Sequence, residues 1–392
     1  MSAAPLRATL PLFDAVAGAP VAGAPGDADP PVAGTVADPV AGGPRDRRWL
    51  PERVLVTADA LAEPFGRAMV ARCEARGVPV EALRGNRLGG LARAGDARAT
   101  ARAAKRTLAL VAAPAGQLSL APIPPSADWQ FHLAQGCPAH CQYCYLAGSL
   151  PGAPVVRAYA NLPAILANLP AYVSGDAARP TSFEASCYTD PLAIEHLTGS
   201  LDLTIRWFGT RTDMAGAHLR WTSKFTTPAL VAPLLALPHG GRTRVRASVN
   251  ADGVARRYES ATAPVAARLA GLARLAEAGY PVGLVIAPIV LDEGWEPAYA
   301  RLLDDAAAAL PAGCDLTVEL ITHRFTPGSR DVLRGWYPNS ALEMEPAQRT
   351  EKRGKFGAVK YVYARDAMRA ARAWFARGIA ERLPGARILY WT

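Results

Sequence analysis

The sequence lacks the features that mark membrane, secreted and disulfide-rich proteins. Its 392 residues contain no apolar run of the roughly 18 residues that a membrane-spanning helix needs, so we expect no membrane partner. The first residues do not show the charged-then-apolar pattern of a secretory signal, which favours a cytoplasmic location. Six cysteines are too few for a disulfide framework in a chain of this length. Lysine is also scarce, because only five of the 43 basic residues are lysines.

The composition is that of a globular protein with an excess of positive charge. Half of the residues are hydrophobic, and the length fits two domains or one α/β barrel with additions. The net charge is +9, and the segment from Arg349 to Arg377 carries nine basic residues against Glu351 and Asp366. Such a concentration of charge favours a polyanionic partner such as nucleic acid. The alternative is a solvated basic helix face.

Strand-like and helix-like runs alternate through most of the chain. The clearest helix, Ala263–Tyr280, has Pro264 in its first turn and ends at Gly279. Strands that alternate with helices form βαβ units and a parallel sheet, so we predict an α/β fold with a partial (β/α) barrel. The runs that we expect to be strands are Arg53–Ala58, Thr107–Ala113, Ser182–Ser186, Leu219–Phe225, Arg244–Asn250, Val282–Ile289 and Asp315–Thr322.

We expect three parts along the chain. Residues 1–48 are rich in Ala, Gly, Pro, Val and Asp, and they have little to bury, so we predict a disordered N-terminal arm. Residues 49–120 are expected to form a small N-terminal α/β unit. Residues 121–392 are expected to form the barrel together with the basic C-terminal segment.

Polar residues interrupt the apolar runs where the predicted strands end. Barrel enzymes place their chemistry at the C-terminal ends of the strands. Cys187 follows the run Phe183–Ser186, and Lys224, Ser248 and Asn250 lie at the ends of later strands. The sequence therefore predicts that these four side chains belong to one site.

Three of the six cysteines form the pattern Cys137-x3-Cys141-x2-Cys144. Thiolates are the usual ligands of iron–sulfur clusters, and three of them leave one iron of a [4Fe-4S] cluster open. That iron can chelate S-adenosylmethionine, whose reductive cleavage yields a 5′-deoxyadenosyl radical. The alternative is a structural zinc site with His140 or His132 as its fourth ligand, but such sites usually combine two ligand pairs.

Further stretches match a known family. The stretches are Gly136–Leu146, Phe183–Cys187, Asp190, Glu195–Thr198, Arg246–Asn250, Ala278–Pro281, Ala287–Ile289, Glu293–Trp295 and Glu319–Thr326. In them the chain resembles the spore photoproduct lyase family, radical S-adenosylmethionine enzymes that repair a thymine–thymine ultraviolet lesion. The resemblance runs from about residue 50 to the end of the chain. It implies a lyase that acts on UV-damaged DNA.

The resemblance implies roles for three further residues. In the family, the adenosyl radical removes a hydrogen from the methylene-bridged thymine dinucleotide, the bridge fragments, and a cysteine quenches the thymine radical. By position that donor is Cys187, and Tyr143 and Tyr145 are the tyrosines that relay a hydrogen atom and regenerate S-adenosylmethionine. The alternative for Cys187 is a buried structural thiol. We interpret Cys73 and Cys314 as structural.

The resemblance also implies cofactor and partner contacts. A reducing electron donor of the flavodoxin or ferredoxin type is expected as a partner. Lys224 is notable because lysine is so scarce, and a compact ammonium suits a cofactor carboxylate or ribose. The alternative for each such residue is a solvated loop position. The cofactor contacts that we expect are Thr189, Asp190, Lys224, Ser248 and Asn250.

DNA contacts are expected in the segment after the last predicted barrel strand, His323–Tyr337, and in the basic stretch Lys352–Lys360. Arg324, Lys355 and Lys360 are candidates for binding phosphates. Phe325, Trp336 and Tyr337 are candidates for apolar wedges that fill the gap left by a lesion drawn out of the duplex. Core packing is the alternative for these aromatic residues.

Two features lie outside the family pattern. Tyr188 stands where the family carries a small hydroxyl residue, so a related lesion, RNA or a small molecule is the alternative substrate. In the N-terminal arm, Thr9–Phe13 resembles the short peptides with which bacterial repair proteins bind the replication sliding clamp, and Leu10–Phe13 is its apolar part. The alternative there is a chance apolar patch.

Overall fold

The computed structural model describes residues 48–89, 91, 96–176, 178–185, 187–353 and 358–392. Three predictions fall on residues outside these ranges. They are the disorder of the N-terminal arm up to residue 47, clamp binding through Leu10–Phe13, and the DNA contact of Lys355.

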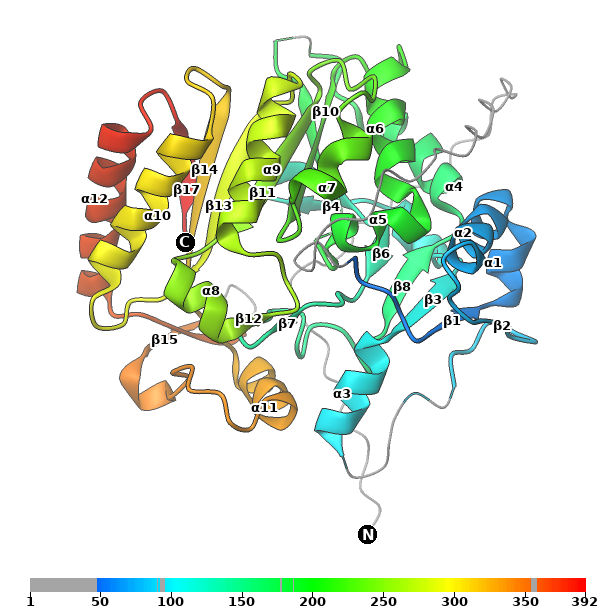
Figure 1. Ribbon diagram of the computed structural model, residues 1–392, viewed down its shortest axis with the longest axis horizontal. Coiled ribbons are helices and arrows are strands. Elements are labelled where there is room, and N and C mark those ends of the chain that lie inside the picture. Colours follow the sequence, from blue (N-terminus) through cyan, green and yellow to red (C-terminus); the bar gives the residue numbers. More distant parts are fainter. Residues whose placement is uncertain (1–47, 90, 92–95, 177, 186, 354–357) are drawn as a thin grey trace.

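The main sheet has eight strands and curls into a half-barrel (Figure 1). All its neighbouring strands are parallel except β4 and β5, which form an antiparallel pair at one edge. The prediction of an α/β partial barrel is therefore confirmed. In spatial order the strands are β17 (Arg387–Trp391), β14 (Leu316–Thr322), β13 (Val282–Ile289), β11 (Thr243–Val249), β10 (Ala217–Ser223), β9 (Thr181–Ala185), β5 (Ala127–Phe131) and β4 (Ala121–Ile123).

Helices cover the outer face of this sheet (Figure 1). The predicted helix at Ala263–Tyr280 is α9 (Val265–Glu277), which begins after Pro264 and is followed by Gly279 at φ +85°. It packs closely, since a Cβ on Gly271 would lie 1.8 Å from the Thr226 carbonyl oxygen. The other covering helices are α5 (Pro191–Thr198), α6 (Ser200–Thr210), α7 (Pro228–Val231), α10 (Trp295–Ala309) and α12 (Arg365–Arg382).

A second sheet of five strands adjoins the half-barrel, with α1 (Ala58–Ala62), α2 (Pro64–Glu74) and α4 (Leu162–Ala167) nearby. The predicted unit at residues 49–120 supplies only three of its strands, and later parts of the chain complete it. The two units are thus interleaved in sequence, and a single buried core spans both. The strand order is β2 (Val80–Ala82), β1 (Arg53–Val56), β3 (Thr107–Val111), β8 (Val156–Tyr159) and β6 (Ala134–Gln135).

Short elements join at the C-terminal ends of the barrel strands. Strand β7 (His140–Cys141) pairs with β12 (Glu259–Ser260), which follows α8 (Asp252–Tyr258). Beyond β14, α11 (Pro327–Trp336) packs against α3 (Ala97–Lys105), and β15 (Thr350–Arg353) forms an antiparallel hairpin with β16 (Val359–Val362). Among the described helices, none is long and apolar enough to cross a membrane.

Candidate functional site

The three cysteines of the predicted cluster site lie on one loop, which follows β6 and passes through β7. The loop starts at Gly136, whose φ of +80° favours glycine and where a Cβ would lie 2.2 Å from the Val155 carbonyl oxygen. Cys137, Cys141 and Cys144 are all free thiols. Gly136 thus brings the ligand loop against the backbone of the strand-β8 region.

Lys105 holds this loop from outside the barrel. Its Nζ, which is almost fully buried at the end of α3, donates to the carbonyl oxygens of Cys137 at 2.8 Å and Ala139 at 2.6 Å. Lys105 was not among the predicted site residues. The scarcity of lysine was the available signal, because a buried lysine is retained only where its ammonium group is satisfied.

The two candidate fourth ligands of a zinc site bear on the choice between a cluster and a single ion. Among the described residues, no group of three His, Cys, Asp or Glu side chains that could hold a metal ion is found. His140 Nδ1 lies 3.2 Å from the Tyr337 hydroxyl, whereas the His132 ring packs on Tyr188 at 4.7 Å and its buried Nδ1 has no hydrogen-bond partner among the described residues. Burial raises the pKa of Cys137 to about 12, so cluster binding must displace protons.

Glu259 connects the ligand loop to the barrel. Its carboxylate accepts a hydrogen bond from the Tyr143 hydroxyl and forms ion pairs with Lys224 at 3.0 Å and Arg268 at 2.6 Å. Burial opposes ionisation, but Lys224 and Arg268 outweigh it and lower the pKa of Glu259 to about 2. Sequence reasoning missed Glu259, because nothing in the sequence shows that a residue 35 positions away faces Lys224.

The predicted cofactor contacts gather here, and most of them already bind protein groups. Lys224 Nζ donates to the Ser248 hydroxyl at 3.0 Å, and Thr189 donates to the Gly136 carbonyl oxygen. Asp190 caps α5 and accepts from the Ser223 hydroxyl and the Lys224 backbone N–H, both at 2.7 Å.

Asn250 is fully buried and satisfied at both ends of its amide. Its Nδ2 donates to the Pro288 carbonyl oxygen and its Oδ1 accepts from the Tyr299 hydroxyl, both at 2.7 Å. In this arrangement Asp190 fixes the backbone at Lys224, and Asn250 fixes the backbone at Pro288. Their direct contact with a cofactor stays a prediction.

The predicted hydrogen donor, Cys187, lies beside the cluster loop. Its carbonyl oxygen accepts a hydrogen bond from Tyr145, and the neighbouring Tyr188 carbonyl accepts from Gly136 N–H at 2.8 Å. Burial and then Glu184 raise the pKa of the Cys187 thiol, so it carries its proton at neutral pH. The Tyr188 ring packs on the His132 ring. This contact accommodates the tyrosine side chain, which is larger than the hydroxyl residue expected at this position.

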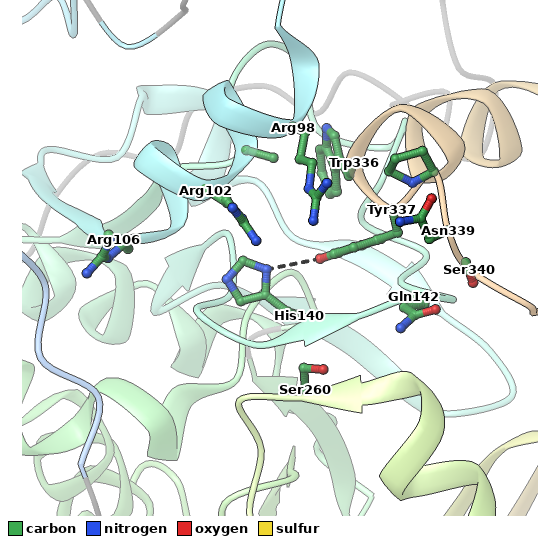
Figure 2. A pocket seen from close by; sticks show the side chains of 12 residues that line it. Arg98, Arg102, Arg106, His140, Gln142, Ser260, Trp336, Tyr337, Asn339 and Ser340 are labelled. Atoms are coloured by element: carbon green, nitrogen blue, oxygen red, sulfur yellow. Dashed lines mark hydrogen bonds between the residues drawn. The ribbon is translucent and has the colours of Figure 1, made fainter.

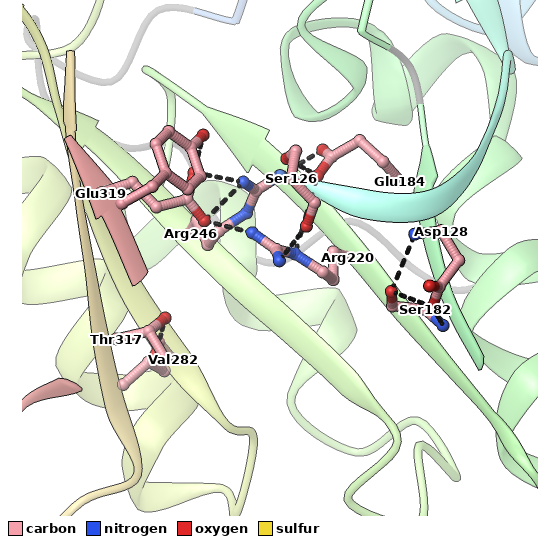
Figure 3. A network of polar contacts seen from close by, with 10 residues as sticks. Ser126, Asp128, Ser182, Glu184, Arg220, Arg246, Val282, Thr317 and Glu319 are labelled. Carbon is pink, nitrogen blue, oxygen red and sulfur yellow. Dashed lines mark hydrogen bonds and ion pairs between the residues drawn. The ribbon is translucent and has the colours of Figure 1, made fainter. Parts of the chain in front are cut away.

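A buried ion network lies in the barrel interior (Figure 3), and two of its members, Glu184 and Arg246, act electrostatically on Cys187. Arg246 bonds both oxygens of Glu319, at 2.9 and 2.8 Å, and also Glu184. Arg220 bonds Glu319 as well, so two cations face two anions. The charges of these four side chains balance one another, and their mutual hydrogen bonds hold them in place inside the barrel.

The predicted DNA contacts fall in two places. Arg324 is exposed beside the β15–β16 hairpin, where Lys360 pairs across strands with Lys352. The wedge role expected for Phe325 is wrong, because this side chain is 3% exposed and packs on Tyr361 at 5.3 Å.

The other two aromatic candidates, Trp336 and Tyr337, are half-buried at the end of α11 against the ligand loop and α3. Core packing, which was the alternative for all three aromatics, therefore applies to Phe325. The DNA contacts of Trp336 and Tyr337 stay predictions.

Comparison with known proteins identifies one family. The spore photoproduct lyase family model matches residues 49–392. The spore photoproduct lyase of Geobacillus sp. (strain Y412MC61) is 35% identical over 348 residues, which cover 88% of this chain and 99% of that protein. The spore photoproduct lyase of Bacillus subtilis (strain 168) is 39% identical over 270 residues, 68% of this chain and 77% of that protein.

Solved structures agree with the sequence comparison. A spore photoproduct lyase variant with bound S-adenosylmethionine and dinucleoside spore photoproduct superposes with a TM-score of 0.81. It is 34% identical, and the match covers 88% of this chain and all of that one. Family, fold and length therefore point the same way: the chain belongs to the spore photoproduct lyase family of the radical S-adenosylmethionine superfamily.

Proposed function

We propose that this enzyme reverts the spore photoproduct, a methylene-bridged thymine dinucleotide, to two thymines in DNA. Cys137, Cys141 and Cys144 would hold a [4Fe-4S] cluster, with Lys105 fixing the loop that bears them. When bound, the cluster and S-adenosylmethionine supply a 5′-deoxyadenosyl radical, which abstracts a hydrogen from the lesion. The free thiols suit a reducing cytoplasmic location.

The position of Cys187, whose carbonyl oxygen accepts a hydrogen bond from Tyr145 of the ligand loop, is the observation that carries the proposal. A hydrogen-atom donor needs an S–H bond, so it must remain a thiol and not a thiolate. Burial keeps the pKa of Cys187 high, unlike a nucleophilic cysteine, whose pKa is lowered by its surroundings. The hydrogen bond from Tyr145 to the Cys187 carbonyl places the two residues side by side.

The two loop tyrosines have different surroundings, which suits a relay with two stations. Tyr143 donates to the Glu259 carboxylate, whereas Tyr145 donates to the Cys187 carbonyl oxygen. The pKa values of both tyrosines are raised, chiefly by burial, so each hydroxyl keeps its hydrogen. We infer that Tyr145 passes a hydrogen atom to the spent Cys187 and that Tyr143 links this step to S-adenosylmethionine regeneration. Lys224 and Ser248 are the polar groups available to orient that cofactor.

DNA binding is assigned to the hairpin and its surroundings. Lys352 and Lys360 face each other across the strands, and no described acidic side chain forms an ion pair with either. Like charges placed opposite each other destabilise a sheet, so their pairing favours a role in binding phosphate. Arg324 extends this positive surface.

The test uses the enzyme reconstituted anaerobically with iron, sulfide and a strong reductant. Synthetic dinucleotide spore photoproduct and S-adenosylmethionine are added, and chromatography with mass detection follows thymidylyl-thymidine and 5′-deoxyadenosine. We expect repaired dinucleotide from the wild type. Formation of 5′-deoxyadenosine without repair would assign the fold to another lesion, RNA or a small molecule.

The donor assignment has its own variant. Cys187→Ala is expected to keep forming 5′-deoxyadenosine but to give aberrant or aborted dinucleotide products. Cys314→Ala is the matched control. Cys314 is also a free cysteine, and it lies in the loop between α10 and β14, so this variant should leave repair unchanged. Clean repair by Cys187→Ala would contradict the assignment of the donor.

A further inference from the structure

A hollow of about 480 Å³ lies outside the barrel, between α3, the ligand loop and the end of α11 (Figure 2). Arg98 and Arg102 line it from α3, and Trp336 and Tyr337 line it from α11. The ligand loop contributes His140 and Gln142. No catalytic role proposed above uses this space, and the predicted DNA contacts of Trp336 and Tyr337 are the competing assignment for it.

The hollow carries positive charge that is not neutralised within the described structure. Arg98 and Arg102 are four residues apart on α3, which aligns them along one face at an interval of about 6 Å, and Arg106 is the residue that ends this helix. All three are exposed. Arg106 pairs with Glu52 at 2.6 Å, whereas no ion pair with a described residue is found for Arg98 or Arg102. The surface is therefore complementary to an acidic partner.

The same hollow lies directly against the ligand loop. His140 and Gln142 flank Cys141 in the sequence, and both contribute to the lining. Tyr337, which contacts His140 at 3.2 Å, is also within electrostatic reach of all three cysteine thiols. Helix α3 is tied to the loop through Lys105.

Side chains of the ligand loop point to two different sides. Tyr143 and Tyr145 reach inward to Glu259 and to the carbonyl of Cys187, where the lesion must react. His140 faces the other way, toward α11 and α3. A partner seated in the hollow would approach the cysteines without obstructing the substrate side.

We propose that this hollow docks a small acidic protein that carries one electron to the cluster site. The inference rests on the proposed function, which requires a reductant. In the transfer the reduced carrier loses one electron and the cluster gains it, and no atom moves between them. Arg98 and Arg102 would bind carboxylates of the carrier, while the tyrosine and histidine side chains separate it from the thiols.

The experiment compares two sources of electrons. The variant is Arg98→Glu/Arg102→Glu, and its control is Arg372→Glu/Arg377→Glu, which makes the same charge change on exposed positions of α12. Each holoenzyme is driven either by dithionite or by flavodoxin with its reductase, at low ionic strength. 5′-Deoxyadenosine is measured with the dinucleotide substrate.

We expect the α3 variant to lose about tenfold or more in kcat/KM for flavodoxin, because opposite charge steers association by such factors. Its dithionite-driven rate should match that of the wild type, and the α12 control should retain both rates. Direct titration of oxidised flavodoxin onto each holoenzyme gives a readout independent of turnover. Binding should weaken only for the α3 variant.

Two outcomes would overturn the proposal. Equal flavodoxin affinity and equal flavodoxin-driven rates in variant and wild type would show that the carrier docks elsewhere. Weaker binding of an irradiated oligonucleotide, with flavodoxin affinity retained, would assign the hollow to DNA. Absence of dinucleotide repair with dithionite concerns the proposed function alone, because flavodoxin binding is measured separately.

Discussion

At the scale of single residues, Gly136 is a position of the ligand loop where the backbone leaves no room for a side chain. Its φ is +80° and a Cβ there would lie 2.2 Å from the Val155 carbonyl oxygen, so Gly136→Ala must displace the start of the ligand loop. We expect reconstituted Gly136→Ala to bind much less iron and sulfide per chain than the wild type. Chemical analysis of both elements measures this.

The matched control for this change is Gly152→Ala. Gly152 has a similar φ of +75°, but a Cβ there meets no atom within 4 Å. Both variants lose roughly 1 kcal/mol from the left-handed backbone conformation, and only Gly136→Ala adds the clash. Equal iron content in the two variants would contradict the claim that close approach at Gly136 shapes the loop.

Single residues also show what sequence reasoning can and cannot reach. The cysteine spacing and the position of Cys187 were visible because they lie within short stretches. Lys105 and Glu259 were not, since each acts through a contact with a residue more than 30 positions away. Asn250 shows the same limit, because its contacts are with residues distant in the sequence. It was predicted to bind the cofactor, but its side-chain amide already forms hydrogen bonds with Pro288 and Tyr299.

At the scale of elements, the β15–β16 hairpin places Lys352 opposite Lys360. Their repulsion destabilises the hairpin, and the same two charges are the proposed phosphate-binding groups. Lys360→Gln removes the repulsion from Lys352 and is expected to stabilise the hairpin by a few tenths of a kcal/mol. It should also weaken binding to irradiated duplex DNA and reduce the slope of log K against log salt by about one. Fluorescence anisotropy over a salt series measures the slope.

A second basic position separates this prediction from a general charge effect. Arg377→Gln removes one exposed charge from α12, and we expect it to leave the salt slope nearly unchanged. If both variants lowered the slope equally, the whole basic segment would contact DNA. If neither did, the hairpin would not be the DNA-binding element.

Elements were predictable where their own residues decide their structure. The apolar runs of β10, β11, β13 and β14 and the helix α9, between Pro264 and Gly279, were expected close to their observed bounds. Strands β6 and β8 are short and complete a sheet that begins some 80 residues earlier, so pairing and not local pattern makes them strands. Strand β17 was not among the expected strands, although Ile388, Leu389, Tyr390 and Trp391 give it an apolar, β-prone run that the local pattern could have predicted.

At the scale of the whole molecule, buried histidines couple stability to pH. Burial lowers the pKa of His132 to about 4, and burial followed by Arg349 lowers that of His323 to about 3. An unfolded histidine titrates near 6.5, so between about pH 6.5 and 4 the unfolded chain binds more protons. These groups therefore remove stability as the pH falls through that range.

The contribution of one histidine can be isolated by substitution. His132→Phe keeps an aromatic ring against Tyr188 but cannot take up a proton. Other buried groups titrate in the same range, such as Glu195, whose pKa burial raises to about 8, so the informative quantity is the difference between variant and wild type. We expect that difference to grow in favour of the variant by about 1.4 kcal/mol per pH unit as the pH falls below about 6.5.

Anaerobic urea unfolding at several pH values between about 7 and 4 measures this difference. The growth should stop near pH 4, where native His132 itself becomes protonated, and it should total roughly 3 kcal/mol. A difference that stays constant over this range would mean that His132 titrates alike in the folded and unfolded chain. The His132 ring would then be open to solvent, and it could not be buried against the Tyr188 ring as the structure shows.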